Sequence, residues 1–246
     1  MGAAITVNEL TIGWGDFVLM HEISFEIQQG DVFVILGGSG CGKSTLLRHL
    51  IGLEQAKSGT IEIAGLGAPR IGEGAPPYGV MFQSGALFGS MTLAENVGLA
   101  LRSWTDLDRD AIDAVVRDKL RLVGLDGFEH HLPAEISGGM KKRAGIARAL
   151  ALDSKLLFLD EPSAGLDPIS AVELDELLLS LNRNLGVTTV LVTHELESIY
   201  KIATRCIMLE KEAKGIIARG NPRELRDTST DPAVSAFFNR TVRGDA

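Results

Sequence analysis

A glycine-rich segment that ends in Lys-Ser-Thr is the first part of the chain whose residue types could do chemistry. Residues 37–45 read Gly-Gly-Ser-Gly-Cys-Gly-Lys-Ser-Thr. Glycines let backbone N–H groups turn toward phosphate oxygens, and a helix that begins after them adds its dipole to the attraction. A β-branched apolar run precedes the segment and a helical pattern follows it, as a phosphate-binding loop requires. We therefore expect a nucleoside triphosphate site, in preference to a glycine-rich turn that binds nothing.

The residues of this loop have separate expected roles. Lys43 should bridge the outer phosphates, Ser44 should ligate Mg²⁺ and Thr45 should support the α-phosphate. The backbone of the remaining positions should cradle the phosphates; these are Gly37, Gly38, Ser39, Gly40, Cys41 and Gly42. Cys41 fills a variable position of the pattern, so we assign it no redox role.

Two adjacent acids end a second apolar run. Residues 156–161 read Leu-Leu-Phe-Leu-Asp-Glu. In open α/β sheets, ligands gather at the carboxyl ends of the strands. We expect Asp160 to hold Mg²⁺ through water and Glu161 to orient and polarise the attacking water. A pair of solvated surface acids is the alternative, and the strand and the loop together argue against it.

Residues 136–140, Ile-Ser-Gly-Gly-Met, lie between these two motifs. Ser137 is a natural helix N-cap, and Gly138 and Gly139 would leave the first N–H groups bare for an anion. The cations at 141–143 follow in the first turns, where the helix dipole disfavours them, so we expect negative charge nearby. Glycine lowers helix stability, and we expect no local packing role that would offset this cost at the two glycines.

Composition limits the class of protein. The chain has 246 residues, 45% hydrophobic and 23% charged, which suits one globular domain or a core with an insertion. With a net charge of −8 and no long basic run, nucleic acid is not an expected partner. Cys41 and Cys206 form no disulfide framework, which favours a reducing compartment. No apolar run approaches the ~20 residues of a membrane span and no signal peptide is recognised, so we expect no membrane crossing.

The order of strand and helix patterns predicts an α/β fold with a parallel sheet, an antiparallel β-layer and a helical insertion. We expect an ATPase domain over 1–220, with the helical part inserted at about 84–154, and a helical extension over 221–246. Expected strands cover 31–36, 59–65, 79–82, 155–159 and 187–193, with a hairpin over 205–219. Expected helices cover 43–52, 108–123 and 172–185, with one from 92 and two after the Asn-Pro and Asp-Pro pairs at 221 and 231.

The loop, the Ser-Gly-Gly helix and the Asp-Glu strand, in this order, resemble the ATP-binding subunit of ABC transporters. The resemblance runs from about Val7 to Gly220 and implies ATP and Mg²⁺ as cofactors. It implies that Gln83 ligates Mg²⁺ and senses the γ-phosphate, and that His194 is a switch histidine. Ser137, Gly138 and Gly139 would contact the ATP of the opposite subunit. The remaining implied contacts are Asp167, in a loop at the dimer interface, and Trp14, stacked on adenine, with Phe17 as the alternative.

Residues 81–88 and 136–143 together resemble one branch, the ATPases of Mla-type (MCE-associated) phospholipid transporters. Met140 stands where most relatives carry Gln. This resemblance implies a homodimer of ATPase subunits, an integral membrane permease dimer, a periplasmic MCE lipid-binding protein and a small cytoplasmic accessory protein. It places the chain at the cytoplasmic face of a bacterial inner membrane.

Two surfaces are expected to meet these partners. Leu87, Phe88 and Met91, in an apolar loop, should be exposed and dock the permease, although the loop could instead pack on its own domain. Val234, Phe237 and Phe238 share a helical face, which we expect to pack on the neighbouring ATPase or the accessory subunit.

The sequence thus predicts a dimeric ATPase that drives a membrane permease, with phospholipid as the cargo. The alternatives are another transported substrate, a soluble cassette ATPase of the iron–sulfur assembly type, or an inert binding module, which Glu161 and His194 disfavour.

Overall fold

The computed structural model describes residues 2–70, 72 and 74–240, and it separates into two compact units. Unit 1 comprises Met1–Ile71 and Thr188–Ala246, and unit 2 comprises Gly72–Val187. The predicted domain limits, 1–220 with an insertion at about 84–154, stay predictions. The last six residues of the predicted extension lie outside the described residues.

Unit 1 contains the predicted antiparallel β-layer. Its strands are β1 (Ala3–Trp14), β2 (Phe17–Gln28) and β4 (Ser58–Ile63), in the order β2-β1-β4. Side chains on these strands alternate between buried and exposed over much of their length, as expected for a sheet with one face on a core. The prediction of this layer is confirmed.

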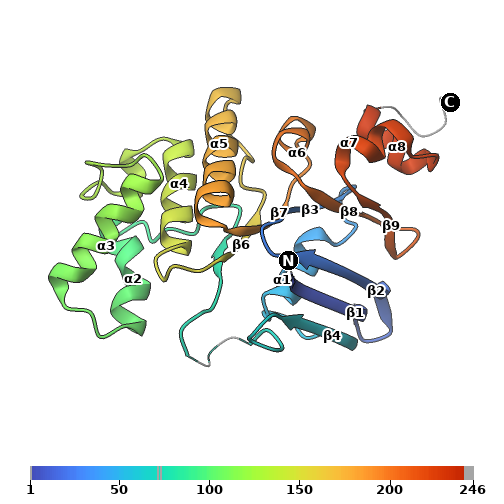
Figure 1. The fold of residues 1–246 in the computed structure, drawn as a ribbon, viewed down its shortest axis with the longest axis horizontal. Coiled ribbons are helices and arrows are strands. Elements are labelled where there is room, and N and C mark those ends of the chain that lie inside the picture. Colours follow the sequence, from blue (N-terminus) through green and yellow to red (C-terminus); the bar gives the residue numbers. More distant parts are fainter. Residues whose placement is uncertain (1, 71, 73, 241–246) are drawn as a thin grey trace. The chain divides into compact units, whose positions relative to one another are not determined.

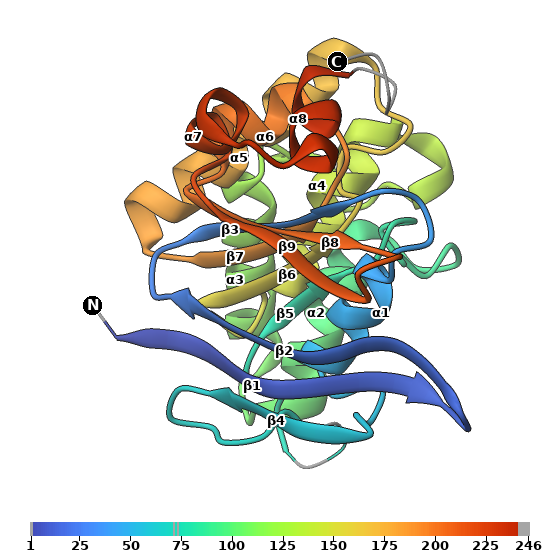
Figure 2. The ribbon, with the colours of Figure 1, turned by 90° about the vertical axis from the view of Figure 1, so that its right-hand side faces the viewer.

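The second sheet in unit 1 carries the glycine-rich loop. Its strands are β7 (Thr188–Val192), β3 (Val32–Gly37), β8 (Arg205–Glu210) and β9 (Gly215–Gly220), in that order, with β9 antiparallel to β8. All six residues of β3 are buried, as a central parallel strand requires. Helices α6 (Leu196–Ile202), α7 (Pro222–Thr228) and α8 (Pro232–Asn239) lie on one side of this sheet, and α1 (Lys43–Leu50) lies on the other (Figures 1 and 2).

A buried carboxylate fixes the start of β3. Asp31 accepts hydrogen bonds from the Gln28 backbone N–H (2.7 Å), the Thr204 hydroxyl (3.0 Å) and Nε of Arg205 (3.0 Å). Because Arg205 begins β8, this network ties the entry of β3 to the entry of β8. The register that follows sets Gly37, at the carboxyl end of β3, opposite Leu209.

The two predicted closing helices are present, but α8 docks differently from our expectation. Val234 and Phe238 are buried within the chain itself. The hydroxyl of Tyr200, on α6, donates to the Phe238 carbonyl (3.1 Å), and the two rings lie 6.0 Å apart. The expectation that this face packs on a neighbouring subunit is therefore wrong for Val234 and Phe238, which the chain itself buries, while Phe237 is half-buried and for it the expectation stays a prediction.

Unit 2 contains two parallel strands and several helices. Strands β5 (Gly79–Met81) and β6 (Leu156–Asp160) pair in parallel. Helices α2 (Leu93–Trp104), α3 (Arg109–Leu122) and α4 (Gly138–Ala149) pack on one another, and α5 (Pro168–Leu185) packs on α4 (Figure 1). A 3-10 turn, η1 (Pro133–Glu135), precedes α4. The predicted α/β class with a helical region is confirmed.

Helix starts follow the capping signals of the sequence, with one start misplaced and one helix missed. Thr92 forms a capping box with Glu95, which fixes the start of α2. Helix α5 begins at Pro168, capped by Asp167, earlier than the predicted start at 172. Asp167 and Pro168 form an Asp-Pro pair at this start, the same helix-start signal that correctly predicted α8. Helix α6 was not expected, and its N-cap Glu195 makes no side-chain capping bond.

Burial in β8 predicts a pH dependence of stability. Burial raises the pKa of the Cys206 thiol to about 12. The stabilisation from the raised pKa is complete below about pH 9, where unfolded thiols begin to ionise, and it falls as pH rises toward the folded value. Between pH 8 and pH 10 the native chain should lose about 1.5 kcal/mol more stability than Cys206→Ala, measured by urea unfolding. An identical loss in both proteins would contradict this assignment.

Candidate functional site

The glycine-rich loop leaves β3 and enters α1 through backbone that only glycine adopts without strain. Gly37 has φ 143° and Gly42, the N-cap of α1, has φ 99°. A Cβ at Gly37 would lie 2.4 Å from the Leu209 carbonyl oxygen, and one at Gly42 would lie 2.6 Å from Cε of Met20. A side chain at Gly37 would push the loop away from the β8 backbone, whereas at Gly42 the side chains of Met20 and Leu19 would have to shift and the left-handed φ would be strained. The loop therefore keeps its backbone amides and the uncapped start of α1 available to an anion.

Lys43 lies over this loop. Its Nζ donates to the carbonyls of Gly37 (2.9 Å) and Gly38 (3.0 Å). Ser44 and Thr45 follow in the first turn of α1 and are half-buried. An ammonium group and the N–H groups of a helix start can donate hydrogen bonds to a triphosphate, and a hydroxyl oxygen can ligate Mg²⁺. The residues present therefore fit both groups.

Cys41 is buried beneath the loop. Burial raises the pKa of its thiol, against the opposing effect of the Lys43 charge. A raised pKa keeps the sulfur as a thiol, which agrees with our assigning it no redox role.

The two aromatic candidates lie together at the tip of the β1–β2 hairpin. Trp14 ends β1 and Phe17 begins β2, and their rings are stacked at 6.3 Å with 9° between the planes. They are 53% and 56% exposed. Both are free to present a flat face to a planar ligand, so the choice between them stays open.

His194 follows β7 and is exposed. Its Nε2 lies 3.7 Å from a carboxylate oxygen of Glu195. The parallel register pairs Ile35 with Val192, so His194 lies level with Gly37, two residues further along the neighbouring strand. The fold of unit 1 thus brings the histidine to the same sheet edge as the glycine-rich loop.

Unit 2 brings the predicted acids and Gln83 to one sheet edge. Asp160 ends β6 and Glu161 follows it, while Gln83 lies just beyond β5 and is exposed. Met81 pairs with Leu159, so Gln83 and Glu161 stand level, two residues beyond the paired strands. Glu161 has φ 47°, a left-handed conformation that is uncommon for residues other than glycine. A strained backbone conformation of this kind persists only where the surrounding structure holds the residue in place.

The Ser-Gly-Gly segment begins α4 as predicted, but one glycine has a packing role that we did not expect. The Ser137 hydroxyl accepts from the Met140 N–H (3.2 Å), which confirms the N-cap. A Cβ at Gly139 would lie 3.1 Å from both Cβ and Oγ of Ser170, on α5. Our expectation of no local packing role is wrong for Gly139, because the close approach of α4 to α5 requires it. At Gly138 a Cβ would meet only Leu166, at 3.6 Å.

Asp167 caps α5. One carboxylate oxygen accepts from the N–H groups of Ile169 (3.1 Å) and Ser170 (3.0 Å), and the other accepts from the Ser170 hydroxyl (2.6 Å). The Ser170 side chain is the main cause of the lowered pKa of this carboxyl. Asp167 is exposed, so a contact with a second subunit remains open to it.

The chain itself supplies acceptors and negative charge near two of the cations that open α4, with the charges of Glu161 and Asp160 acting on Lys142. Lys142 is buried and donates to the backbone carbonyls of Gln83 and Glu161. Arg143 lies 3.7 Å from a carboxylate oxygen of Glu173. The negative charge expected near these cations is therefore partly intramolecular.

Two polar residues that we did not single out, the half-buried Arg148 and the buried Asn96, shape the loop after Gln83. Arg148, on α4, donates to the carbonyls of Gly85 and Ala86. Asn96, on α2, accepts from the Phe88 N–H (2.8 Å) and donates to the carbonyls of Phe88 (3.1 Å), Met91 (3.0 Å) and Thr92 (3.0 Å). The sequence feature that could have indicated the role of Asn96 is its position on the apolar face of a helix, three residues after Leu93.

The loop is less exposed than predicted. Phe88 is 50% exposed, while Leu87 and Met91 are half-buried. Among the described residues, no helix combines the length and the hydrophobicity that a bilayer span needs.

Comparison with known proteins agrees with this geometry. The model of the ABC transporter family matches residues 20–164. The chain belongs to the ABC transporter family. The probable ribonucleotide transport ATP-binding protein mkl of Mycobacterium leprae is 41% identical over 244 residues, which cover 97% of this chain and 70% of that protein. The sulfate/thiosulfate import ATP-binding protein CysA of Nocardia farcinica is 37% identical over 97% of this chain and 71% of its own length.

Solved structures of ABC cassettes share the fold. CbiO1 of Clostridium perfringens, part of the transporter complex cbiONQ, superposes with a TM-score of 0.82 at 29% identity, covering 92% of each chain. The dimeric cassette MJ0796 in a post-hydrolysis state, bound to ADP and Pi, gives a TM-score of 0.77 at 25% identity, over 88% of this chain and 98% of that one. These findings confirm an ATP-binding transporter subunit, an ATPase by class, with ATP and Mg²⁺ as its cofactors.

The four hydrogen bonds of Asn96 predict a large effect of its removal. In Asn96→Leu, of similar size, the Phe88 N–H and the Met91 carbonyl would lose their partner, and the Phe88 and Thr92 carbonyls would keep only a backbone donor, which should cost about 2–4 kcal/mol of unfolding free energy. Asn184→Ala is the control, because Asn184 is exposed and bonds only the nearby Ser180 hydroxyl (3.1 Å), so less than about 0.5 kcal/mol is expected. Equal stabilities of the two variants in urea unfolding would contradict the loop-holding role.

Proposed function

We propose that this ATPase drives phospholipid transport between the inner and outer membranes of a bacterium, at the cytoplasmic face of the inner membrane. One observation carries the proposal. The two segments that resemble Mla-type ATPases, 81–88 and 136–143, contact each other in unit 2 through Lys142 and the Gln83 carbonyl. Arg148, just beyond the second segment, holds the carbonyls of Gly85 and Ala86 in the first. The two segments on which the branch resemblance rests thus form one connected structure.

In this proposal unit 1 binds the nucleotide. The amides of residues 37–42 and the start of α1 hold the phosphates, and Lys43 exchanges its carbonyl partners for the outer phosphates. Trp14 or Phe17 stacks on adenine, and His194 contacts the γ-phosphate. Mg²⁺, held by Ser44, Gln83 and water on Asp160, would neutralise charge on the outer phosphates.

Unit 2 supplies the groups for hydrolysis. The Glu161 carboxylate accepts a proton from the attacking water and so raises its nucleophilicity. Gln83 senses the γ-phosphate and leads directly into the loop of residues 84–92. The held backbone of that loop gives a route from the nucleotide to a membrane partner.

A second copy of the chain completes the proposed site. Ser137, Gly138 and Gly139 present the start of α4, with Gly138 exposed, to ATP held by the partner subunit. Asp167 is proposed to lie at the same interface. Binding of ATP then joins the two subunits, and hydrolysis releases them.

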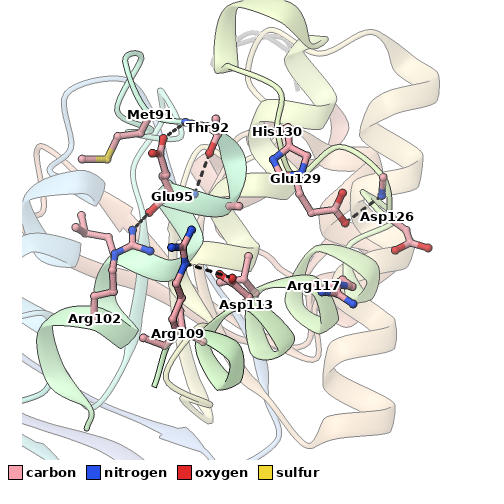
Figure 3. A pocket seen from close by; sticks show the side chains of 15 residues that line it. Met91, Thr92, Glu95, Arg102, Arg109, Asp113, Arg117, Asp126, Glu129 and His130 are labelled. Atoms are coloured by element: carbon pink, nitrogen blue, oxygen red, sulfur yellow. Dashed lines mark hydrogen bonds and ion pairs between the residues drawn. The ribbon is translucent and has the colours of Figure 1, made fainter. Parts of the chain in front are cut away.

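The proposed permease surface lies on unit 2. Phe88 lines a cleft of about 380 Å³ with Tyr78, Leu99 and Trp104. A separate cleft of about 1230 Å³ between α2 and α3 is lined by Met91 and by side chains of both charges, including Glu95, Arg102, Arg109 and Asp113 (Figure 3). Apolar and mixed-charge linings suit a polypeptide better than a small anion. The MCE protein and the accessory protein rest on the resemblance alone.

Transport of a polar solute is the second candidate. The relative at 41% identity is named for ribonucleotide transport, and one at 37% is named for sulfate and thiosulfate import. Both names describe those proteins and concern cargo that differs from lipid.

The cargo can be tested on the intact complex. When the chain is purified with its permease in mild detergent, we expect phospholipid in the complex by mass spectrometry and stimulation of ATP hydrolysis by added phospholipid. Stimulation by ribonucleotides or sulfate, with no retained phospholipid, would overturn the lipid proposal.

Glu161→Gln tests the hydrolytic role. The amide cannot accept the proton, so turnover should fall by about 10²–10⁴-fold while ATP still binds and the dimer persists in size-exclusion chromatography with ATP. Lys43→Ala is the contrasting variant, because it should lose ATP binding and therefore the ATP-dependent dimer. Normal turnover by Glu161→Gln would remove Glu161 from this role.

Phe88→Asp tests the docking surface. A carboxylate in an apolar contact is costly, so co-purification with the permease should fall at least about tenfold. Leu66→Asp, a change at a similarly exposed leucine of unit 1 (51%), should leave co-purification at the native level. Equal recovery of the permease with both variants would place the docking surface elsewhere.

A further inference from the structure

We propose that Lys142 is a positioning residue for ATP hydrolysis: its ammonium group ties the backbone of Gln83 and Glu161 to helix α4, and so sets the aim of both side chains. This inference rests on the proposed roles of Gln83 and Glu161. It adds a group that the motifs of the sequence do not assign, since we read Lys142 only as one of three cations near the helix start.

The placement of Lys142 is specific. It is the fifth residue of α4 and 7% exposed, and its Nζ donates to the Gln83 carbonyl and, at 3.3 Å, to the Glu161 carbonyl. Gln83 and Glu161 stand level beyond the paired strands β5 and β6. One ammonium group therefore bridges the two strand ends that carry the proposed γ-phosphate sensor and the proposed base.

The bridge contacts backbone that needs support. Glu161 has φ 47°, and Gly85 and Ala86, in the turn after Gln83, have φ 75° and 49°. A left-handed residue other than glycine is strained and persists only where its surroundings hold it. The Glu161 carbonyl accepts from the Ala164 N–H (3.2 Å) as well as from Lys142. Loss of the Lys142 bond would weaken this support, and relaxation of Glu161 to an ordinary conformation would turn its carboxylate in another direction.

Packing alone does not account for a lysine here. Burial lowers the pKa of Lys142, because the charged form loses solvation, and the charges of Asp160 and Glu161 partly offset this. The helix dipole also disfavours a cation in the first turns of α4. An apolar side chain of similar length would avoid both penalties, so the carbonyl contacts are what the ammonium group adds.

The same helix face continues the contact along the loop. Gly145 lies one turn after Lys142, and a Cβ there would lie 3.2 Å from the Gly85 carbonyl oxygen. Arg148 lies one turn further on and donates to the carbonyls of Gly85 and Ala86. Helix α4 thus holds three carbonyls of the turn after β5, and Lys142 is the member that also reaches Glu161.

The test uses the full chain in complex with its permease. Lys142→Met removes the donor and should lower kcat for ATP by about 10–100-fold, with KM for ATP within about twofold, because the ATP-binding loop is untouched. Lys142→Arg keeps a cation with several donors and should restore kcat to within about fivefold of the native value. Lys155→Met is the matched control: Lys155 is exposed, donates to the Leu185 carbonyl (3.1 Å) and precedes β6, so native kcat is expected.

Combination with Glu161→Gln separates this inference from the proposed function. Since Lys142 acts through Glu161 and Gln83, adding Lys142→Met to Glu161→Gln should lower kcat by at most about threefold further, which is the part of its effect that passes through Gln83. Near-native turnover of Glu161→Gln would reject the role of Glu161 itself. If Glu161→Gln is impaired but Lys142→Met keeps kcat within twofold, or if the two losses multiply, the positioning role is rejected.

A folding defect is identified by thermal unfolding of each variant. If Lys142→Met does not fold, Lys142→Gln and Lys142→Arg decide the matter: kcat should fall in the order Lys, Arg, Gln at unchanged KM. Equal kcat in Arg, Gln and native proteins, or a loss that Arg does not rescue, would overturn the inference.

Discussion

The turn that leaves β5 imposes the constraint on which much of unit 2 depends. The carbonyls of Gln83, Gly85 and Ala86 lie beyond the strand, and a carbonyl that is shielded from water and has no donor is costly. Helix α4 meets this need with Lys142 and Arg148 on one face. Because these donors come from the helix that Ser137 caps, satisfying the turn also fixes where the helix start lies. The same hydrogen bonds thus satisfy the backbone of the turn and set the proposed catalytic geometry.

Unit 1 meets a different constraint, the close passage of the glycine-rich loop between neighbouring strands. Asp31 fixes the entry of β3, the parallel register carries this to Gly37, and the Leu209 carbonyl leaves no room for a side chain there. The loop is consequently preformed, with Lys43 held on its own carbonyls. A preformed loop spends little free energy on ordering when an anion binds.

The sequence predicted most of the site because its residues sit at the ends of elements, where local signals are strong. Ser137 caps α4 as expected, and the glycine-rich loop lies between β3 and α1. The sequence could not show that Gly139 packs on Ser170 or that Tyr200 bonds the Phe238 carbonyl. Those contacts join residues 31 and 38 positions apart, and no local pattern encodes them.

By itself, the sequence determined the class of the chain, its ATPase chemistry and the residues proposed to perform it. These depend on residue type and short spacing, which act through backbone geometry close by. Only the tertiary structure decided which polar groups are buried and what they hold. Lys142 and Asn96 look like ordinary polar residues in the sequence. Their roles appear once distant carbonyls without strand partners are brought to them, because hydrogen bonding of buried backbone is settled by the whole fold.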